Sequence, residues 1–168
     1  MRVAVTGTPG TGKTTAVDLA SVDLEVIHLN DVIRDEGFTQ GVDDDRGSVV
    51  ADVAAVNAWL GDRDDVLFES HLAHRFDADH VVVLRCAPET IERRLRDRGE
   101  SAESARENAE SEALDLILSE AVAAVGEDTV YEIDTTDLSP EAVAAAIEAV
   151  VAGEREPSAG TVDYTDYL

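Results

Sequence analysis

Lysine is almost absent from this chain of 168 residues, because Lys13 is its only one and every other basic residue is an arginine or histidine. Acidic residues number 37, and the formal net charge is -24. A surface this acidic repels the phosphates of duplex DNA and an anionic membrane, so we expect direct contact with neither. The composition is also typical of a molar-salt cytoplasm, where salt screens the self-repulsion, and it predicts a halophilic source.

Cysteine and long apolar runs are scarce as well. Cys86 is the only cysteine, which excludes an internal disulfide and a zinc site built on cysteines. No apolar run reaches the length of about 18 residues that a membrane span needs, and a strand candidate follows Met1 directly. We therefore expect a soluble, cytoplasmic protein.

Short apolar runs alternate with helical patterns along the chain. Strands are expected at residues 2–6, 25–28, 65–69, 80–85 and 129–133, and helices at 13–21, 31–37, 49–60, 88–97, 102–125 and 140–152. Helices between strands indicate parallel pairing with right-handed crossovers. The sequence thus predicts one three-layer α/β domain over residues 1–152, with a parallel, five-stranded sheet. Residues 153–168, rich in Gly, Pro and Ser, are expected to form a flexible acidic tail.

The segment at residues 7–15 reads GTPGTGKTT and fits the phosphate-loop pattern GxxxxGK[ST]. It lies between a strand candidate and a helix candidate, where backbone N–H groups and a helix N-terminus surround a phosphate. Lys13 is expected to reach the β and γ oxygens of ATP, and Thr14 to offer its hydroxyl to Mg²⁺. The expected fold is therefore that of a P-loop NTPase.

Two observations narrow the class of P-loop protein. A GTPase needs a guanine-reading Asn-Lys-x-Asp segment late in the chain, and no second lysine exists to form one. A motor of the AAA or helicase type would need a longer chain. A small nucleotide or metabolite kinase fits the length.

Arginines gather in the second half of the chain, with six of them against five acids between residues 85 and 106. Phosphoryl transfer requires such positive charge, and planar guanidinium groups match phosphate oxygens in pairs. Arg98, at the end of a helix candidate, is predicted to close over ATP, with residues 97–107 as a short lid. Most of the other arginines are expected to pair with neighbouring acids on the surface.

Candidate acceptor and metal residues lie near the ends of the second and third strands. Arg34 is predicted to face the cleft opposite the phosphate loop and to hold the phosphate of an acceptor. Glu69 ends an apolar strand, the position that orients Mg²⁺ and its waters. His71 is expected near the γ-phosphate. Asp31 is predicted to bind the acceptor together with Arg34. It also offers the carboxylate base that a hydroxyl-acceptor kinase needs, so a kinase of another small metabolite stays open.

These motifs resemble the adenylate kinase isoenzyme 6 family, small adenylate kinases and ATPases of archaea and eukaryotes implicated in small-subunit ribosome maturation. The resemblance covers about residues 1–150 and rests on the phosphate loop, DxxR at 31–34, ExH at 69–71, LRC at 84–86, RLRDRG at 94–99 and ENAESE at 107–112. It implies ATP contacts from Gly10, Gly12, Lys13, Thr14, Thr15 and Arg98, an AMP-binding segment near residues 28–51, and a basic small-subunit ribosomal protein as partner.

The expected reaction is the Mg²⁺-dependent conversion of ATP and AMP to two ADP. The attacking phosphate oxygen is already ionised at neutral pH, so positioning and charge neutralisation by Lys13 and Arg98 suffice, with Arg34 on AMP. A hypothesis of another class is an ATP-driven assembly factor in rRNA maturation, which hydrolyses ATP with a water positioned by His71. The two activities can coexist.

Overall fold

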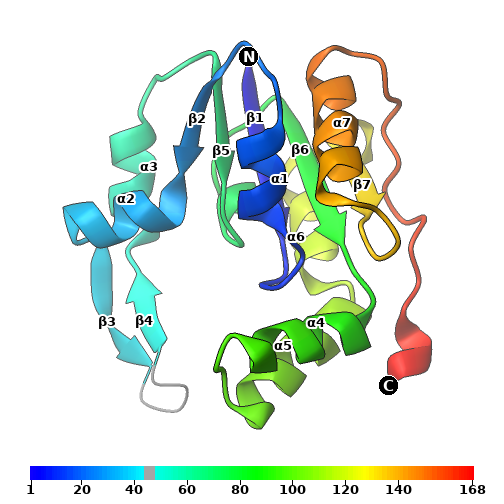
Figure 1. The fold of residues 1–168 in the computed structure, drawn as a ribbon. Helices are drawn as coiled ribbons and strands as arrows, with labels where there is room; N and C mark the ends of the chain where they lie inside the picture. Colours follow the sequence, from blue (N-terminus) through cyan, green and yellow to red (C-terminus); the bar gives the residue numbers. More distant parts are fainter. Residues whose placement is uncertain (44–47) are drawn as a thin grey trace.

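A computed structural model describes residues 1–43 and 48–168, and in these ranges the predicted parallel, five-stranded sheet is confirmed (Figure 1). The strand order is β2-β5-β1-β6-β7. The strands are β1 Arg2–Gly7, β2 Glu25–His28, β5 Val66–Glu69, β6 His80–Arg85 and β7 Val130–Asp134. Most of their interior residues are apolar and buried because helices cover both faces of the sheet.

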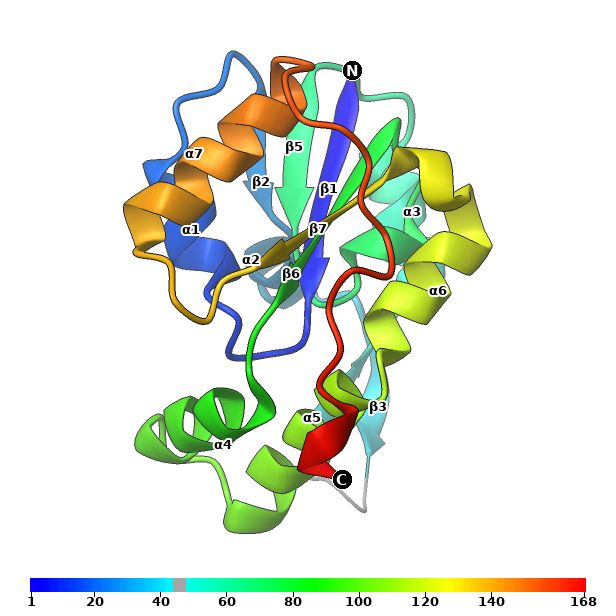
Figure 2. The ribbon, with the colours of Figure 1, turned by 90° about the vertical axis from the view of Figure 1, so that its right-hand side faces the viewer.

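The helices form the outer layers of a three-layer domain (Figures 1 and 2). On one face α1 and α7 pack through Val17 and Ile147, and on the other α3 and α6 pack through Leu60 and Leu118. The helix bounds are α1 Lys13–Leu19, α2 Leu29–Glu36, α3 Val53–Leu60, α4 Pro88–Asp97, α5 Ala102–Ala113, α6 Leu116–Val125 and α7 Pro140–Val151. Short 3-10 helices lie at Ala73–Arg75, Glu127–Thr129 and Thr165–Tyr167.

The prediction of one helix over residues 102–125 was wrong, because the chain breaks between α5 and α6. Asp115 adopts a left-handed conformation with φ of 56°. Its carboxylate accepts a hydrogen bond of 2.6 Å from the buried guanidinium of Arg85. The apolar periodicity continues across the break, so the sequence pattern does not reveal a turn that a distant arginine stabilises.

The helix predicted at residues 49–60 was also too long at its start. Residues Ser48–Ala51 form β4, which pairs antiparallel with β3, Thr39–Asp43. Helix α3 begins at Val53, where the Asp52 side chain caps it by accepting from the Ala55 amide at 3.1 Å. The expected AMP-binding segment 28–51 thus contains α2 and a hairpin, and its residues 44–47 lie outside the described residues.

Residues 153–168, for which the composition predicts a flexible tail, make hydrogen bonds to the rest of the domain. It runs beside β7 toward α4 and α5 (Figure 2). Its amides and hydroxyls bond strand and helix residues: Ser158 to Val130, Thr161 and Val162 to Glu132, Tyr164 to Asp134 and Tyr167 to Glu92. Side-chain partners on the sheet, which composition does not encode, hold this segment in place.

None of the helices in the described part of the chain has the length and apolar character to cross a bilayer. The carboxyl ends of the sheet strands share one edge, and the loop after β1, helices α4 and α5, and the β3–β4 hairpin all lie at that end (Figure 1). Ligands of open parallel sheets bind at this edge.

Candidate phosphate-binding site

The loop between β1 and α1 packs closely on the neighbouring strand. A Cβ atom at Gly7 would lie 2.7 Å from the carbonyl oxygen of Leu84, so only glycine fits there. Gly12 has φ of 89° and forms the cap of α1. Within the loop, the Thr11 amide and hydroxyl both donate to the Thr8 carbonyl, at 3.2 and 2.9 Å. The predicted phosphate loop therefore has a fixed backbone path.

Lys13 is nearly buried at the start of α1. Its Nζ donates to the carbonyl oxygens of Gly7 and Thr8, at 2.9 and 3.2 Å. Burial lowers the pKa of Lys13 to about 8, while the carboxylates of Glu69 and Glu112 act in the opposite direction. At neutral pH this ammonium group is charged and lies against the loop carbonyls.

Thr14 and Glu69 meet next to Lys13. The Thr14 hydroxyl donates to Glu69 Oε1 at 3.2 Å, and Glu69 is 2% exposed at the end of β5. His28 bonds the same carboxylate oxygen at 2.7 Å and Asp18 at 2.8 Å. Burial lowers the pKa of His28, but these two carboxylates outweigh that effect and raise it. The sequence singled out Glu69 but gave no sign of its contact with His28.

This pair of oxygens fits the way proteins hold Mg²⁺. Mg²⁺ prefers oxygen ligands, keeps several waters, and is bound by one or two protein groups together with substrate phosphates. The described residues contain no group of three or more His, Cys, Asp or Glu arranged to hold a metal without a substrate. Thr14 and Glu69 are therefore suited to an ion that arrives with a phosphate.

A cavity of about 220 Å³ opens on one side of the loop, and we call it the loop cavity. Gly12, Thr15 and Arg98 line it together with Thr11, Ala16, Arg94, Thr135, Leu138, Pro140 and Val143. Arg94 also donates from Nη1 to the carbonyl oxygen of Gly10 at 3.0 Å. This contact was not predicted from the sequence, which favoured a surface pair between Arg94 and a neighbouring acid. The signal was available, because Arg94 lies four residues before Arg98 and on the same side of the helix.

A second cavity, of about 460 Å³, lies beside α2 and is called here the α2 cavity. Arg34 and His71 line it, with Asn30, Ile33, Gly37, Thr39, Ala51 and Leu72. Burial lowers the pKa of His71 to about 4, and the charge of Lys13 adds to that shift. His71 is therefore neutral at physiological pH and can accept or donate a hydrogen bond.

Asp31 does not line the α2 cavity. Its carboxylate is exposed and pairs with the Arg34 guanidinium at 3.2 Å, one turn along α2. A carboxylate in that position neutralises Arg34 instead of facing a hydroxyl in the cavity. The geometry therefore gives no support to Asp31 as a catalytic base.

His74 is a structural residue of this region. Its ring is hydrogen-bonded to the Thr6 hydroxyl at 2.8 Å and to Glu120 at 2.6 Å, and it is 3% exposed. It therefore ties the end of β1 to α6.

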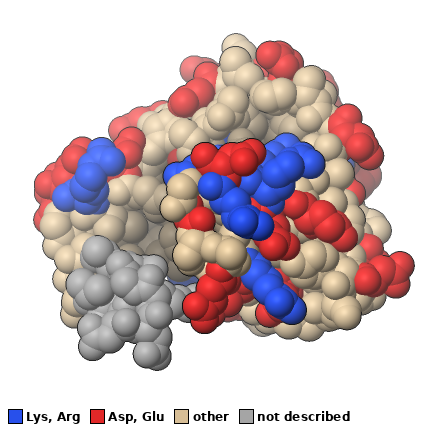
Figure 3. All heavy atoms as spheres, turned by 60° about the horizontal axis from the view of Figure 1, so that its bottom comes forward, with Lys and Arg blue, Asp and Glu red and all other residues tan. Residues whose placement is uncertain are grey.

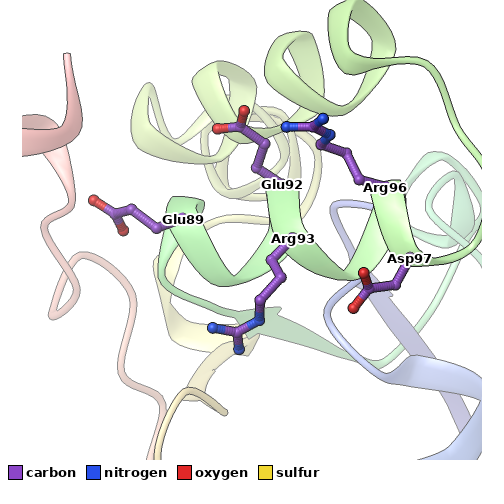
Figure 4. A pocket seen from close by; sticks show the side chains of 5 residues that line it. All are labelled: Glu89, Glu92, Arg93, Arg96 and Asp97. Carbon is purple, nitrogen blue, oxygen red and sulfur yellow. The ribbon is translucent and has the colours of Figure 1, made fainter.

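Basic side chains gather at the carboxyl-end face of the sheet, among acidic ones (Figure 3). On the outer side of α4 a further pocket of about 460 Å³ is lined by charged residues alone: Glu89, Glu92, Arg93, Arg96 and Asp97. Figure 4 shows these side chains leaving the helix in different directions. Small-molecule sites are mostly apolar with a few convergent polar groups, so this pocket does not have the form of a substrate site.

Comparisons with known proteins identify the family of this chain. A family model described as an AAA domain matches residues 3–115. The chain is 67% identical to a protein of Halobacterium salinarum named "Putative adenylate kinase" and 63% identical to one of that name from Natronomonas pharaonis, both over 100% of each chain. A protein of that name from Methanothermobacter thermautotrophicus is 40% identical over 99% of this chain and 98% of its own.

Solved structures also resemble the chain in fold. A shikimate kinase from Bacteroides thetaiotaomicron matches 90% of this chain and 98% of its own with a TM-score of 0.57 and 16% identity. A sulfotransferase from Alicyclobacillus acidocaldarius matches 98% of this chain and 86% of its own with a TM-score of 0.53 and 12% identity. Together with the family match, these likenesses confirm the predicted P-loop NTPase fold.

Proposed function

The chain belongs to the family of archaeal proteins named "Putative adenylate kinase", and from this premise we propose that it transfers the γ-phosphoryl group of ATP to AMP, giving two ADP. Membership of this family supports a nucleotide kinase. The assignment of AMP as the acceptor rests on the two cavities.

The observation that carries the proposal is the position of Lys13 relative to these cavities. Its charge interacts with Arg98, which lines the loop cavity, and with His71, which lines the α2 cavity. A kinase needs donor and acceptor sites on two sides of the transferred group, with positive charge between them. We assign ATP to the loop cavity and AMP to the α2 cavity.

In this arrangement the protein supplies charge and positioning. Lys13 and Arg98 stabilise the negative charge of the transferred phosphoryl group, and Gly10, Gly12 and Thr15 contact the ATP phosphates. Thr14 and Glu69 would hold Mg²⁺, which neutralises and orients the phosphate oxygens when bound. Arg34 would bind the AMP phosphate, with residues 28–51 as the AMP segment and 97–107 as the lid.

An ATPase that assists small-subunit ribosome maturation is the second candidate, and it can coexist with the first. Its support is the neutral, partly buried His71 close to Lys13, which can orient a water against the γ-phosphate. The acidic surface suits a basic ribosomal protein, although a halophilic cytoplasm, which we also propose, accounts for the same charge. A His71→Ala variant that loses hydrolysis but keeps AMP phosphorylation would separate the two activities.

A steady-state comparison of two arginine variants tests the acceptor assignment. Arg34→Ala should raise the KM for AMP about 10- to 100-fold, the size expected for a lost charge-assisted hydrogen bond, and leave the KM for ATP unchanged. Arg63, which stacks on Trp59 and lines neither cavity, supplies the control as Arg63→Ala. Equal KM values for AMP in wild type, Arg34→Ala and Arg63→Ala would remove AMP from the α2 cavity.

A further inference from the structure

A buried ionic cluster lies between the phosphate loop and α5. Arg85, at the end of β6, is 1% exposed, and its guanidinium bonds three carboxylates: Glu112 at 3.0 Å, Asp115 at 2.6 Å and Glu132 at 2.9 Å. One guanidinium therefore faces three acids. Glu132 alone would neutralise the single charge of Arg85, so charge balance with Arg85 does not explain a second buried carboxylate, Glu112.

Glu112 is the member of this cluster that reaches the phosphate loop. Its Oε1 accepts from the Thr8 hydroxyl at 3.3 Å and from Arg85, and its Oε2 accepts from the Cys86 amide at 2.9 Å. Glu112 is 3% exposed. Burial raises its pKa, which means that the charged form is costly here. Three donors directed at the carboxylate offset that cost.

The contact with Thr8 matters because Thr8 supports Lys13. The Thr8 carbonyl oxygen accepts from Lys13 Nζ, from the Thr11 amide and from the Thr11 hydroxyl. A hydrogen bond that fixes the Thr8 side chain therefore also fixes the peptide to which the lysine binds. Glu112 lines neither cavity, so it acts on the loop and not on a substrate.

We propose that Glu112 is a positioning residue that holds the phosphate loop in its ATP-binding shape from α5, through the Thr8 hydroxyl. The inference rests on the proposed function. It also connects the loop to the proposed lid at 97–107: the first turns of α5 belong to that segment, and the last turn of the same helix carries Glu112, which bonds Thr8.

The test compares Glu112→Gln with Glu132→Gln. A glutamine has one acceptor oxygen for the three donors around Glu112, so at least one contact is lost. Glu132→Gln removes a negative charge beside the same guanidinium, and the Glu132 side chain has no hydrogen bond to the phosphate loop. We expect Glu112→Gln to raise the ATP dissociation constant and the KM for ATP about tenfold, with the KM for AMP unchanged. Glu132→Gln should lower the melting temperature and leave both ATP values unchanged.

A second pair of variants keeps the test valid if Glu112→Gln does not fold. Thr8→Val removes only the hydroxyl and should weaken ATP binding by a similar factor, whereas Thr8→Ser restores the donor and should recover it. Combined with Glu112→Gln, Thr8→Val should add little, because both remove one contact. The inference would be overturned if the effects of Thr8→Val and Glu112→Gln on ATP binding were additive. It would also be overturned if Thr8→Val had the same dissociation constant and KM for ATP as wild type.

Calorimetric ATP binding separates this inference from the proposed function. If wild type binds ATP but phosphorylates no AMP, the proposed function fails. The ATP dissociation constants of wild type and the Glu112 variant still test the positioning role. If wild type phosphorylates AMP and the Glu112 and Thr8 variants bind ATP as wild type does, the positioning role alone fails.

Discussion

Lys13, to which we assign a catalytic role, combines a positive charge with a buried environment. Two backbone carbonyls accept from its Nζ, and burial lowers its pKa to about 8 against the opposing carboxylates of Glu69 and Glu112. The ammonium form binds phosphate oxygens and the neutral amine does not. ATP should therefore bind with full affinity below the pKa of Lys13. The affinity should fall as the pH rises through that pKa, because binding then requires Lys13 to take up a proton.

The first prediction concerns this titration. The dissociation constant of ATP for the wild-type protein should rise about tenfold between about pH 7 and pH 9, as a group with a pKa near 8 loses its proton. Calorimetry at constant salt measures it. The Lys13→Met variant should bind weakly with a flat profile, and a wild-type profile equally flat would show that Lys13 does not titrate in this range.

The sequence alone predicted the main residues of the candidate site but not the side chains that hydrogen-bond to them. The phosphate-loop pattern identified Lys13 and Thr14, and the strand ends identified Glu69 and His71. The hydrogen-bond partners that support these residues were not predictable. Glu112 bonds Thr8, whose carbonyl oxygen accepts from Lys13, across 104 residues of sequence, and His28 bonds Glu69 across 41. No local spacing encodes such contacts, because they exist only once the strands are ordered in the sheet.

At the scale of elements, the strands and the layered arrangement followed from apolar runs alternating with helical patterns. The errors all arose where a tertiary contact overrides a local pattern. Asp115 turns toward Arg85 and ends α5, and residues 48–51 pair with β3 instead of continuing a helix. The flexibility predicted for residues 153–168 stays a prediction, although their hydrogen bonds to β7 favour an ordered segment.

A prediction at this scale concerns the tail. The backbone amides of Thr161 and Val162 and the Thr161 hydroxyl donate to Glu132 Oε1, each at 2.8 Å. Deleting residues 158–168 leaves that buried oxygen without these donors. We expect the free energy of unfolding to fall by about 2–3 kcal/mol, measured by urea denaturation in molar KCl.

Tyr164→Phe is the matched control for the deletion. It removes only the hydroxyl that donates to Asp134 at 2.6 Å, and we expect a smaller loss of about 1 kcal/mol. A deleted protein as stable as wild type would mean that the tail is frayed in solution, as its composition alone predicts.

For the whole molecule, the net charge of -24 determines how stability responds to salt. Self-repulsion among carboxylates destabilises the compact state, and the screening length falls from about 10 Å at 0.1 M salt to about 3 Å at 1 M. The melting temperature should therefore rise as KCl increases over this range, as the proposed halophilic source requires.

A charge-reduced variant checks that this response comes from carboxylate repulsion. Glu127, Asp128 and Glu141 are exposed, and changing them to Gln, Asn and Gln lowers the negative charge without touching either cavity. The variant should show a smaller rise in melting temperature with KCl than wild type. An unchanged slope would assign the salt effect to something other than net charge.

The central claim is that ATP and AMP meet across Lys13, and a product assay tests it most directly. ADP and free phosphate are followed in molar KCl with Mg²⁺ and ATP, with and without AMP. We predict ADP formation that depends on AMP, with two ADP for each AMP consumed and little free phosphate. Phosphate release that is indifferent to AMP, without phosphorylation of AMP, would contradict the claim and favour the ATPase assembly factor.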